Sequence, residues 1–321
     1  MSDPTPLRSA ARRASVVDAL LLAVAVAWGS TYWVAKELVS QDTVLAVLGV
    51  RMTMTAVALG LILVGMRKRL QKTEAVIGCV LGLLLSTVFT FETFGIAATS
   101  ATNAGLIISL TIVMTPVLET VVGKRELSRL FYLAAVIAVA GVYFLATGGA
   151  AASFGFGDLL ILLAAVARAV HVTGMHRLSA GRSIDSLNLT FVQMATCAVV
   201  FLIMSSLWGT PALTYTTNMD WSAALQMAYL VIVCTVFPFF IQMWAVRKTS
   251  PTRVSLLLGT EPVWAAVIGV TLAGDVLGPI GIFGVVLVLA GTMWGQRLEL
   301  KTLPTTPVAT REPEEIRTPT A

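Results

Sequence analysis

The chain has 321 residues, of which 57% are hydrophobic and only 12% charged, with a formal net charge of +5. A soluble domain carries about 25% charged residues, and half of that charge does not cover a globule of this size in water. The composition therefore excludes, as first interpretations, a cytosolic enzyme, a nucleic-acid-binding protein and a secreted domain. It indicates a polytopic helical membrane protein.

The N-terminal residues 1–15 form a basic segment that leads into a long apolar run. Arg8, Arg12 and Arg13 followed by small apolar residues resemble a secretory signal. The run is nevertheless long enough to cross a membrane. We therefore expect it to be retained as the first span, preceded by a cytoplasmic segment.

Ten apolar stretches approach the roughly 20 residues that a membrane-spanning helix needs. Lipid offers no partner for an open backbone, so the spans must be helices, and their short connections make neighbours antiparallel. We predict an all-α polytopic fold with ten transmembrane helices and a disordered cytoplasmic tail at residues 297–321. The predicted spans are Val16–Leu38, Thr43–Met66, Ala75–Ala97, Thr102–Val122, Leu130–Thr147, Asp158–Leu178, Leu187–Trp208, Ser222–Val246, Val254–Ala273 and Pro279–Gln296.

The basic residues are distributed unequally between the two ends of these spans. Cytoplasmic loops of membrane proteins are enriched in Lys and Arg. With the N-terminus inside, 19 of the 22 Lys and Arg fall on the inner side, so we expect both termini in the cytoplasm, in a cell membrane. The 19 are Arg8, Arg12, Arg13, Arg67, Lys68, Arg69, Lys72, Lys124, Arg125, Arg129, Arg177, Arg182, Arg247, Lys248, Arg253, Arg297, Lys301, Arg311 and Arg317.

The two halves of the chain share short motifs. Residues 99–102 (TSAT) precede span four, and residues 249–252 (TSPT) precede span nine. A Pro-Val pair begins at residue 116 and again at 262, and an Ala-Gly pair begins at residue 140 and again at 290. We predict two five-helix repeats, residues 16–148 and 157–296. Because five is odd, the second repeat enters the membrane inverted, a plan common among secondary transporters.

Several motifs in this order resemble the drug/metabolite transporter superfamily, in its EamA-type branch. They are Trp28-Gly29-Ser30 with Lys36, Arg51, the stretch Thr99–Leu110 with Pro116, Gly157-Asp158-Leu159-Leu160, and Thr260-Glu261-Pro262-Val263 with Gly269, Leu272 and Asp275. The resemblance covers residues 16–297. It implies a ten-helix carrier that moves amino acids, other small metabolites or toxic compounds, mostly outward. Arg168, usually aromatic or apolar in the family, and Asp275, usually Glu, depart from the pattern.

Six charged side chains fall within or at the edge of the predicted spans. A charge at the centre of a membrane helix costs roughly 2.5–3.5 kcal/mol, so most of the six must be paired or face a hydrated cavity. Charges in this position are functional candidates by default. The six are Lys36, Arg51, Glu92, Glu119, Arg168 and Glu261.

Prolines accompany the acidic candidates. We expect Pro116, Pro238 and Pro262 to kink their helices, since proline removes a backbone hydrogen bond. Glu261, beside Pro262, is the candidate for binding a substrate amine or a proton, and a buried structural ion pair is the alternative. Glu119 is a weaker candidate for a gate or ion pair, with simple placement at the interface as the alternative.

The basic candidates allow several pairings. Arg168 and His171, three residues apart, share a helix face and could bind a substrate carboxylate or phosphate. A structural Arg–Glu pair is the alternative for Arg168. Arg51 and Glu92 could form an outer gate pair, or Arg51 could extend to the interface. Lys36 fits an interfacial anchor.

Aromatic, small and sulfur-containing residues complete the prediction. Trp28, Tyr32 and Trp264 are candidates for a pocket lining, and small residues in spans five and ten indicate a scaffold or a dimer surface, so a homodimer is one expectation. Three scattered cysteines and two histidines predict neither a disulfide framework nor a metal site. We expect no cofactor.

These features favour a secondary carrier that exports a small metabolite by alternating access, with the lipid bilayer and protons as its further partners. Facilitated diffusion fits equally well, and there is no P-loop pattern for ATP. An importer or a lipid-intermediate flippase on the same fold is the alternative. A membrane-embedded enzyme is disfavoured because the chain lacks paired aspartates and has only two histidines.

Overall fold

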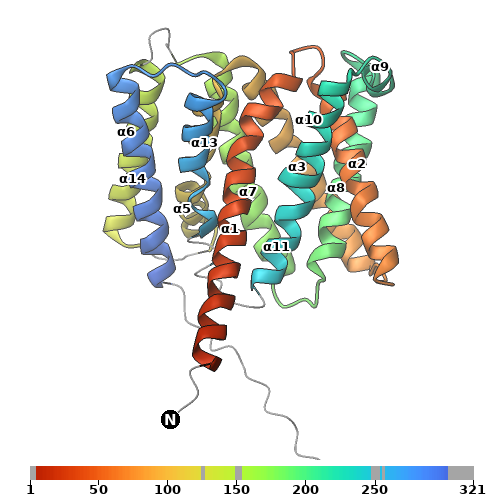
Figure 1. The fold of residues 1–321 in the computed structure, drawn as a ribbon, viewed down its shortest axis with the longest axis horizontal. Coiled ribbons are helices and arrows are strands. Elements are labelled where there is room, and N and C mark those ends of the chain that lie inside the picture. Colours follow the sequence, from red (N-terminus) through yellow and green to blue (C-terminus); the bar gives the residue numbers. More distant parts are fainter. Residues whose placement is uncertain (1–4, 124–126, 149–153, 247–253, 255–256, 303–321) are drawn as a thin grey trace, which may run out of the picture.

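A computed structural model describes residues 5–302, apart from 124–126, 149–153, 247–253 and 255–256. The regular structure of the described residues is entirely helical (Figure 1). The first half contains α1 (Thr5–Leu38), α2 (Val44–Gly65), α3 (Lys72–Ala98), α4 (Ala101–Ile108), α5 (Thr111–Gly123) and α6 (Arg129–Gly148).

The second half follows the same general order. It contains α7 (Phe156–Ser179), α8 (Ser186–Leu207), the short α9 (Ala212–Thr217), α10 (Trp221–Val231), the π-helix η1 (Ile232–Val236), α11 (Phe237–Val246), α13 (Glu261–Thr271) and α14 (Pro279–Thr302). The start of α1 and the end of α14 lie at the same end of the bundle, the lower end in Figure 1.

Eight segments of the described chain are long and apolar enough to cross a membrane. Two shorter apolar helices, Arg129–Leu145 and Glu261–Thr271, occupy the places predicted for the fifth and ninth spans. The polytopic all-α fold is therefore confirmed. Helix α1 begins at Thr5, well before the predicted start of the first span.

The fourth and ninth spans are interrupted, where the sequence predicted continuous helices. Ser109 and Leu110 form a turn between α4 and α5, and Gly259 and Thr260 form a turn before α13. Hydroxyl groups satisfy local carbonyls at both breaks, since Ser109 Oγ donates to Leu106 O at 2.6 Å and Thr260 Oγ1 donates to Leu257 O at 2.7 Å. The two breaks are separated by the same number of residues as the TSAT and TSPT motifs.

The three prolines expected to kink helices behave differently from one another. Pro116 lies inside α5. Pro262 lies in the first turn of α13 and so begins a helix, a position where its missing N–H would be unsatisfied in any case. Pro238 is the second residue of α11, which follows η1, so its missing backbone donor is accommodated by a widened π-helical turn. The kink prediction was therefore wrong for Pro262.

Helices α6 and α14 pack against each other at one edge of the bundle, on the left in Figure 1. Their glycines permit very close backbone contact. A Cβ atom at Gly141 would lie 2.5 Å from Val288 N, and one at Gly291 would lie 2.5 Å from Ala138 N. Small residues allow such contact between helices in lipid. These helices fit the predicted scaffold, away from the centre of the bundle.

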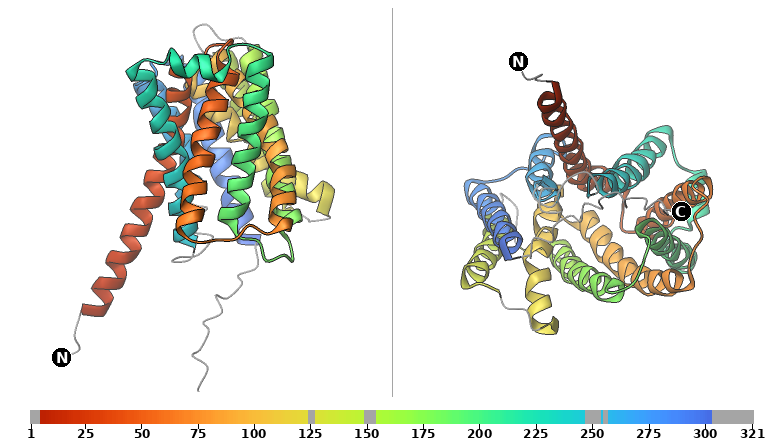
Figure 2. Two further views of the ribbon diagram at one scale, coloured as in Figure 1. Left: turned by 90° about the vertical axis from the view of Figure 1, so that its right-hand side faces the viewer. Right: turned by 90° about the horizontal axis from the view of Figure 1, so that it is seen from below.

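Helices α2, α3, α7 and α8 form a second closely packed group. A Cβ atom at Gly78 or Gly82 of α3 would lie 2.6 Å from Val192 or Thr196 of α8. The right-hand view of Figure 2 shows this group and α1, α10, α11 and α13 arranged around a common centre. Residues of these helices line the candidate site.

Candidate functional site

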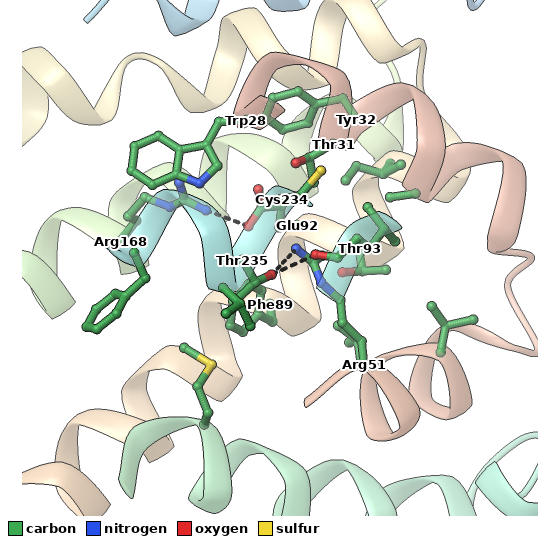
Figure 3. A pocket seen from close by; sticks show the side chains of 18 of the residues that line it. Trp28, Thr31, Tyr32, Arg51, Phe89, Glu92, Thr93, Arg168, Cys234 and Thr235 are labelled. Carbon is green, nitrogen blue, oxygen red and sulfur yellow. Dashed lines mark hydrogen bonds and ion pairs between the residues drawn. The ribbon is translucent and has the colours of Figure 1, made fainter. Parts of the chain in front are cut away.

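A cavity of about 270 Å³ lies between the two halves of the chain (Figure 3). Its wall comes from α1, α2, α3, α7, α8, α10, η1, α11 and α13. Polar and charged lining residues are Thr31, Tyr32, Arg51, Glu92, Thr93, Arg168, Thr190, Cys234, Thr235 and Glu261. Apolar and aromatic ones are Trp28, Ala35, Val47, Leu48, Leu59, Phe89, Ile96, Met194, Leu230, Val236 and Phe239.

Helix α1 presents one face to the cavity and an adjacent face to the backbone of α13. Trp28, Tyr32 and Ala35, at spacings of three and four residues, line the cavity. On the adjacent face, a Cβ atom at Gly29 would lie 2.8 Å from Ala265 N of α13. Close backbone packing thus holds Tyr32 beside α13.

Tyr32 and Glu261 are joined across the cavity wall. The Tyr32 hydroxyl, whose residue is 3% exposed, donates to Glu261 Oε1 at 3.0 Å. Glu261 is the first residue of α13, after the break, and the N-terminus of a helix favours a negative charge. The interruption of the ninth span therefore places a carboxylate at the cavity.

Arg168 and Glu92 form an ion pair in the cavity. Arg168 Nη2 lies 2.7 Å from Glu92 Oε2, and the two side chains are 31% and 8% exposed. The sequence analysis gave two possible ion pairs, the first between Arg51 and Glu92 and the second between Arg168 and a glutamate. The structure contains the second. The proposed pairing of Arg51 with Glu92 was wrong, since Glu92 reaches across to α7.

Arg51 has a different environment. Its Nη2 donates to Thr235 Oγ1 at 3.3 Å, and its buried Nε has no hydrogen-bond partner among the described residues. Thr235 belongs to η1, whose wider turn brings three consecutive residues, Cys234 to Val236, to the cavity. Figure 3 shows the Arg51 and Arg168 side chains entering the cavity from opposite sides.

Four of the predicted candidates do not line the cavity. His171 is 8% exposed, and its Nε2 lies 2.7 Å from Gln193 Oε1 on α8. Trp264 packs beneath Gly29, Lys36 donates to the backbone oxygen of Thr99, and Glu119 lies on α5. The structure thus brings together Trp28, Tyr32, Arg51, Glu92, Arg168 and Glu261 from the predicted set.

Sequence reasoning missed several lining residues on the same helix faces. Phe89 and Ile96 lie three and four residues from Glu92, so the helical period was a signal that could have found them, whereas Thr93 is its immediate neighbour. No comparable signal existed for Cys234 and Thr235, because their exposure to the cavity depends on the π-helical turn.

A polar cluster surrounds the start of α4, at the end of the bundle where α1 ends. Asp158 Oδ1 accepts hydrogen bonds from Thr99 Oγ1 and from Asn103 Nδ2, the latter at 3.1 Å. Asp275 Oδ2 accepts from the backbone N–H of Thr102 at 2.7 Å. Asp275 thus caps a backbone N–H in the first turn of α4, Asp158 binds two side chains beside it, and both carboxylates link the second half of the chain to the first.

A second polar cluster lies at the opposite end, where α2, α3 and α8 meet. Glu74 accepts from Asp185 N and Asn188 Nδ2, both at 2.8 Å, and Lys68 forms an ion pair with Asp185. Burial raises the pKa of the Asp185 carboxyl, but hydrogen bonds from Lys68 and from the backbone of Leu187 and Asn188 outweigh it. The pKa of Asp185 therefore lies below its ordinary value.

Metal-ligating residues do not gather in the described part of the chain. No group of three His, Cys, Asp or Glu side chains is placed to hold a metal ion there. Cys79, Cys197 and Cys234 are free thiols. The chemistry available at the cavity is therefore charge pairing, hydrogen bonding and apolar contact.

Comparison with known proteins gives matches along most of the chain. The sequence profile of the EamA-like transporter family matches residues 16–147 and 155–294. An uncharacterized transporter of Archaeoglobus fulgidus is 25% identical over 283 residues, which are 85% of this chain and 83% of that protein. The uncharacterized inner membrane transporter YedA of Escherichia coli is also 25% identical over 283 residues, 84% of this chain and 90% of that protein.

A solved structure, described only as the crystal structure of a protein, resembles the chain in fold. The TM-score is 0.53 at 17% sequence identity, and the match covers 87% of this chain and 96% of the other. At this identity the likeness concerns the fold alone.

Proposed function

The chain belongs to the EamA-like transporter family and is a multi-pass membrane transporter, and from this premise we propose a specific mode of action. It is a secondary carrier that exports a small metabolite, such as an amino acid or a related compound, across the cytoplasmic membrane by alternating access. The observation that carries the proposal is the cavity, which contains four charged side chains and is lined from both halves of the chain.

The proposal includes ten spans built as two inverted five-helix repeats, with both termini in the cytoplasm. Its support is the match of the family profile in two stretches and the helix breaks at Ser109–Leu110 and Gly259–Thr260. Transporters built from inverted repeats commonly bind substrate where helices are discontinuous. The break before Glu261 adjoins the cavity.

Alternating access requires the two repeats to move relative to each other about this cavity. Helices α6 and α14 are the fixed scaffold in this proposal, because they pack mainly against each other and do not contribute to the cavity wall. Glu261 is the candidate proton carrier, since its carboxylate lines the cavity, whereas His171 is engaged with Gln193 outside it.

Metabolite profiling of cells tests the proposed function. Cells producing the wild-type protein are compared with cells producing equal amounts of Glu261→Gln, which keeps an oxygen for the Tyr32 hydroxyl but removes the charge. Glu37→Gln is the matched control, because Glu37 is exposed at the end of α1. We expect a metabolite to accumulate outside cells with the wild type and the control, and not with Glu261→Gln.

The possible results separate the parts of the proposal. Equal accumulation with Glu261→Gln would remove Glu261 from the mechanism and leave export standing. Depletion of a component of the medium by wild-type cells would contradict export and make the protein an importer. Profiles that do not differ between producing and non-producing cells would contradict metabolite export altogether.

A further inference from the structure

The charges in the cavity are not fully matched by one another, and this concerns the substrate class of the transport site proposed above. Arg168 and Glu92 compensate each other at 2.7 Å. Of the other two charged lining residues, Arg51 and Glu261, neither forms an ion pair among the described residues. One positive and one negative charge therefore remain available in the same cavity.

Among the described residues, no carboxylate lies within ion-pair distance of Arg51. The hydrogen bond that its Nη2 donates there, at 3.3 Å, goes to the neutral hydroxyl of Thr235, and its buried Nε–H has no acceptor in the same part of the chain. A guanidinium carries five donors in a planar fork that fits a carboxylate with two parallel hydrogen bonds. A desolvated cation in such surroundings is stabilised when a ligand brings the missing anion.

Glu261 is the negatively charged counterpart of Arg51 in the cavity, and these two residues are called the poles of the site below. Its Oε1 accepts from Tyr32, and this neutral donor does not compensate the carboxylate charge. A ligand ammonium group can supply both the positive charge and further donors. Because Tyr32 holds the carboxylate from the α1 side, the position of this pole is fixed before the ligand arrives.

The remaining wall limits the size and polarity of the ligand. A volume of about 270 Å³ corresponds to about nine water molecules at roughly 30 Å³ each, below the range of drug-sized pockets. Leu59, Phe89, Met194 and Phe239 supply an apolar part of the wall. The ligand is therefore small and carries an apolar portion in addition to its charges.

We infer that the substrate is a small zwitterion, bound with its anionic group on Arg51 and its ammonium group on Glu261, and that the site discriminates against singly charged compounds. This inference rests on the proposed transport function. A lipophilic cation would meet Glu261 but leave Arg51 uncompensated and be repelled by it. A monoanion would leave Glu261 uncompensated in the same way. The Arg168–Glu92 pair joins α7 to α3 in the cavity wall and does not bind the charged groups of the substrate.

Release from proteoliposomes tests the inference with defined probes. Vesicles containing the purified full-length protein are loaded with a small-molecule extract of producing cells. The extract is supplemented with leucine and its two singly charged counterparts, isopentylamine and isocaproate. Mass spectrometry then compares release with that from protein-free vesicles. We expect the compounds whose release the protein accelerates to be zwitterions.

Two substitutions at the poles make the assignment specific. In Arg51→Gln we expect the preference for a transported zwitterion over its decarboxylated amine to fall at least about tenfold, because the repelling cation is gone. Glu261→Gln should lower the preference over the deaminated acid in the same way. Arg69→Gln, which removes the same charge from an exposed position at the end of the bundle, is the matched control and should leave both preferences unchanged.

A misfolded protein cannot produce a changed preference, because the change requires that the variant still transports. Accelerated release of a singly charged compound by the wild type would overturn the inference and leave the transport function standing. Unchanged preferences in both pole variants would also overturn it. Absence of any accelerated release would contradict the proposed function itself, and the inference with it.

Discussion

The Arg168–Glu92 pair offers a test of how charges are accommodated inside this bundle. Arg168→Met and Glu92→Leu each remove one partner and keep a side chain of similar bulk, and the double variant removes both. If the two charges compensate each other, each single variant leaves an unmatched charge in the bundle. The double variant strands neither member of the pair, so its cost should be much smaller than the sum of the two single costs.

The magnitudes follow from the burial of the two side chains. Removing one partner of a buried ion pair typically costs about 3–5 kcal/mol, whereas replacing both by apolar residues is often nearly neutral. Glu92 is 8% exposed and Arg168 31% exposed. We therefore expect Arg168→Met, which strands the more buried charge, to cost about 3 kcal/mol. Glu92→Leu should cost about 2 kcal/mol, because partial exposure of Arg168 screens its charge.

Thermal unfolding in detergent measures the effect. For a chain of this size class, 1 kcal/mol corresponds to a shift of about 2–4 °C in Tm, so Arg168→Met should lower Tm by about 6–12 °C. All variants are heated at one rate, because unfolding of such proteins is commonly irreversible. The double variant should unfold within a few degrees of the wild type. A double variant whose loss equals the sum of the single losses would refute the compensation argument.

Three further predictions concern single contacts. Tyr32→Phe removes the donor to Glu261 and should cost about 1.5–3 kcal/mol in the same heating assay; an unchanged Tm would contradict the contact. Asp275→Ala leaves Thr102 N–H without its acceptor and should cost a similar amount, with Asp275→Asn recovering part of the loss. The pKa of Asp185 is lowered, so its stabilising contribution is present above the ordinary carboxyl pKa and is lost as pH falls through the lowered value. Wild-type Tm should therefore decrease from about pH 5 toward pH 3 more steeply than that of Asp185→Asn, and parallel profiles would contradict this.

The sequence predicted the uninterrupted helices closely because their signal is local. The predicted spans Leu187–Trp208 and Asp158–Leu178 correspond to α8, Ser186–Leu207, and α7, Phe156–Ser179. Long apolar runs bounded by polar residues define such helices by composition alone. The break in span four had no comparable signal, because Ser109 and Leu110 are ordinary residues for a membrane helix and the turn depends on packing around it. At the break in span nine, Gly259 and Pro262 were a local signal.

The sequence predicted which charged residues line the cavity better than it predicted which of them form ion pairs. The position of a residue along a span gives its depth, and Arg51, Glu92, Arg168 and Glu261 all reach the cavity. Pairing also depends on how each helix is rotated and which helices are neighbours, which the sequence does not show. His171 illustrates this limit. It lies three residues after Arg168, which corresponds to about 300° of helix rotation. Its side chain is therefore turned about 60° from that of Arg168 and contacts Gln193 instead of the cavity.

Accessibility of the cavity from both sides of the membrane is the most direct test of alternating access. Thr93, which lines the cavity, is changed to Cys in a chain whose Cys79, Cys197 and Cys234 are replaced by Ser. A membrane-impermeant thiol reagent is then applied to sealed right-side-out and inverted vesicles of a variant shown to transport. The account predicts labelling from both faces, reduced in each case by the transported metabolite. Labelling from one face alone, whether or not the metabolite is present, would contradict it.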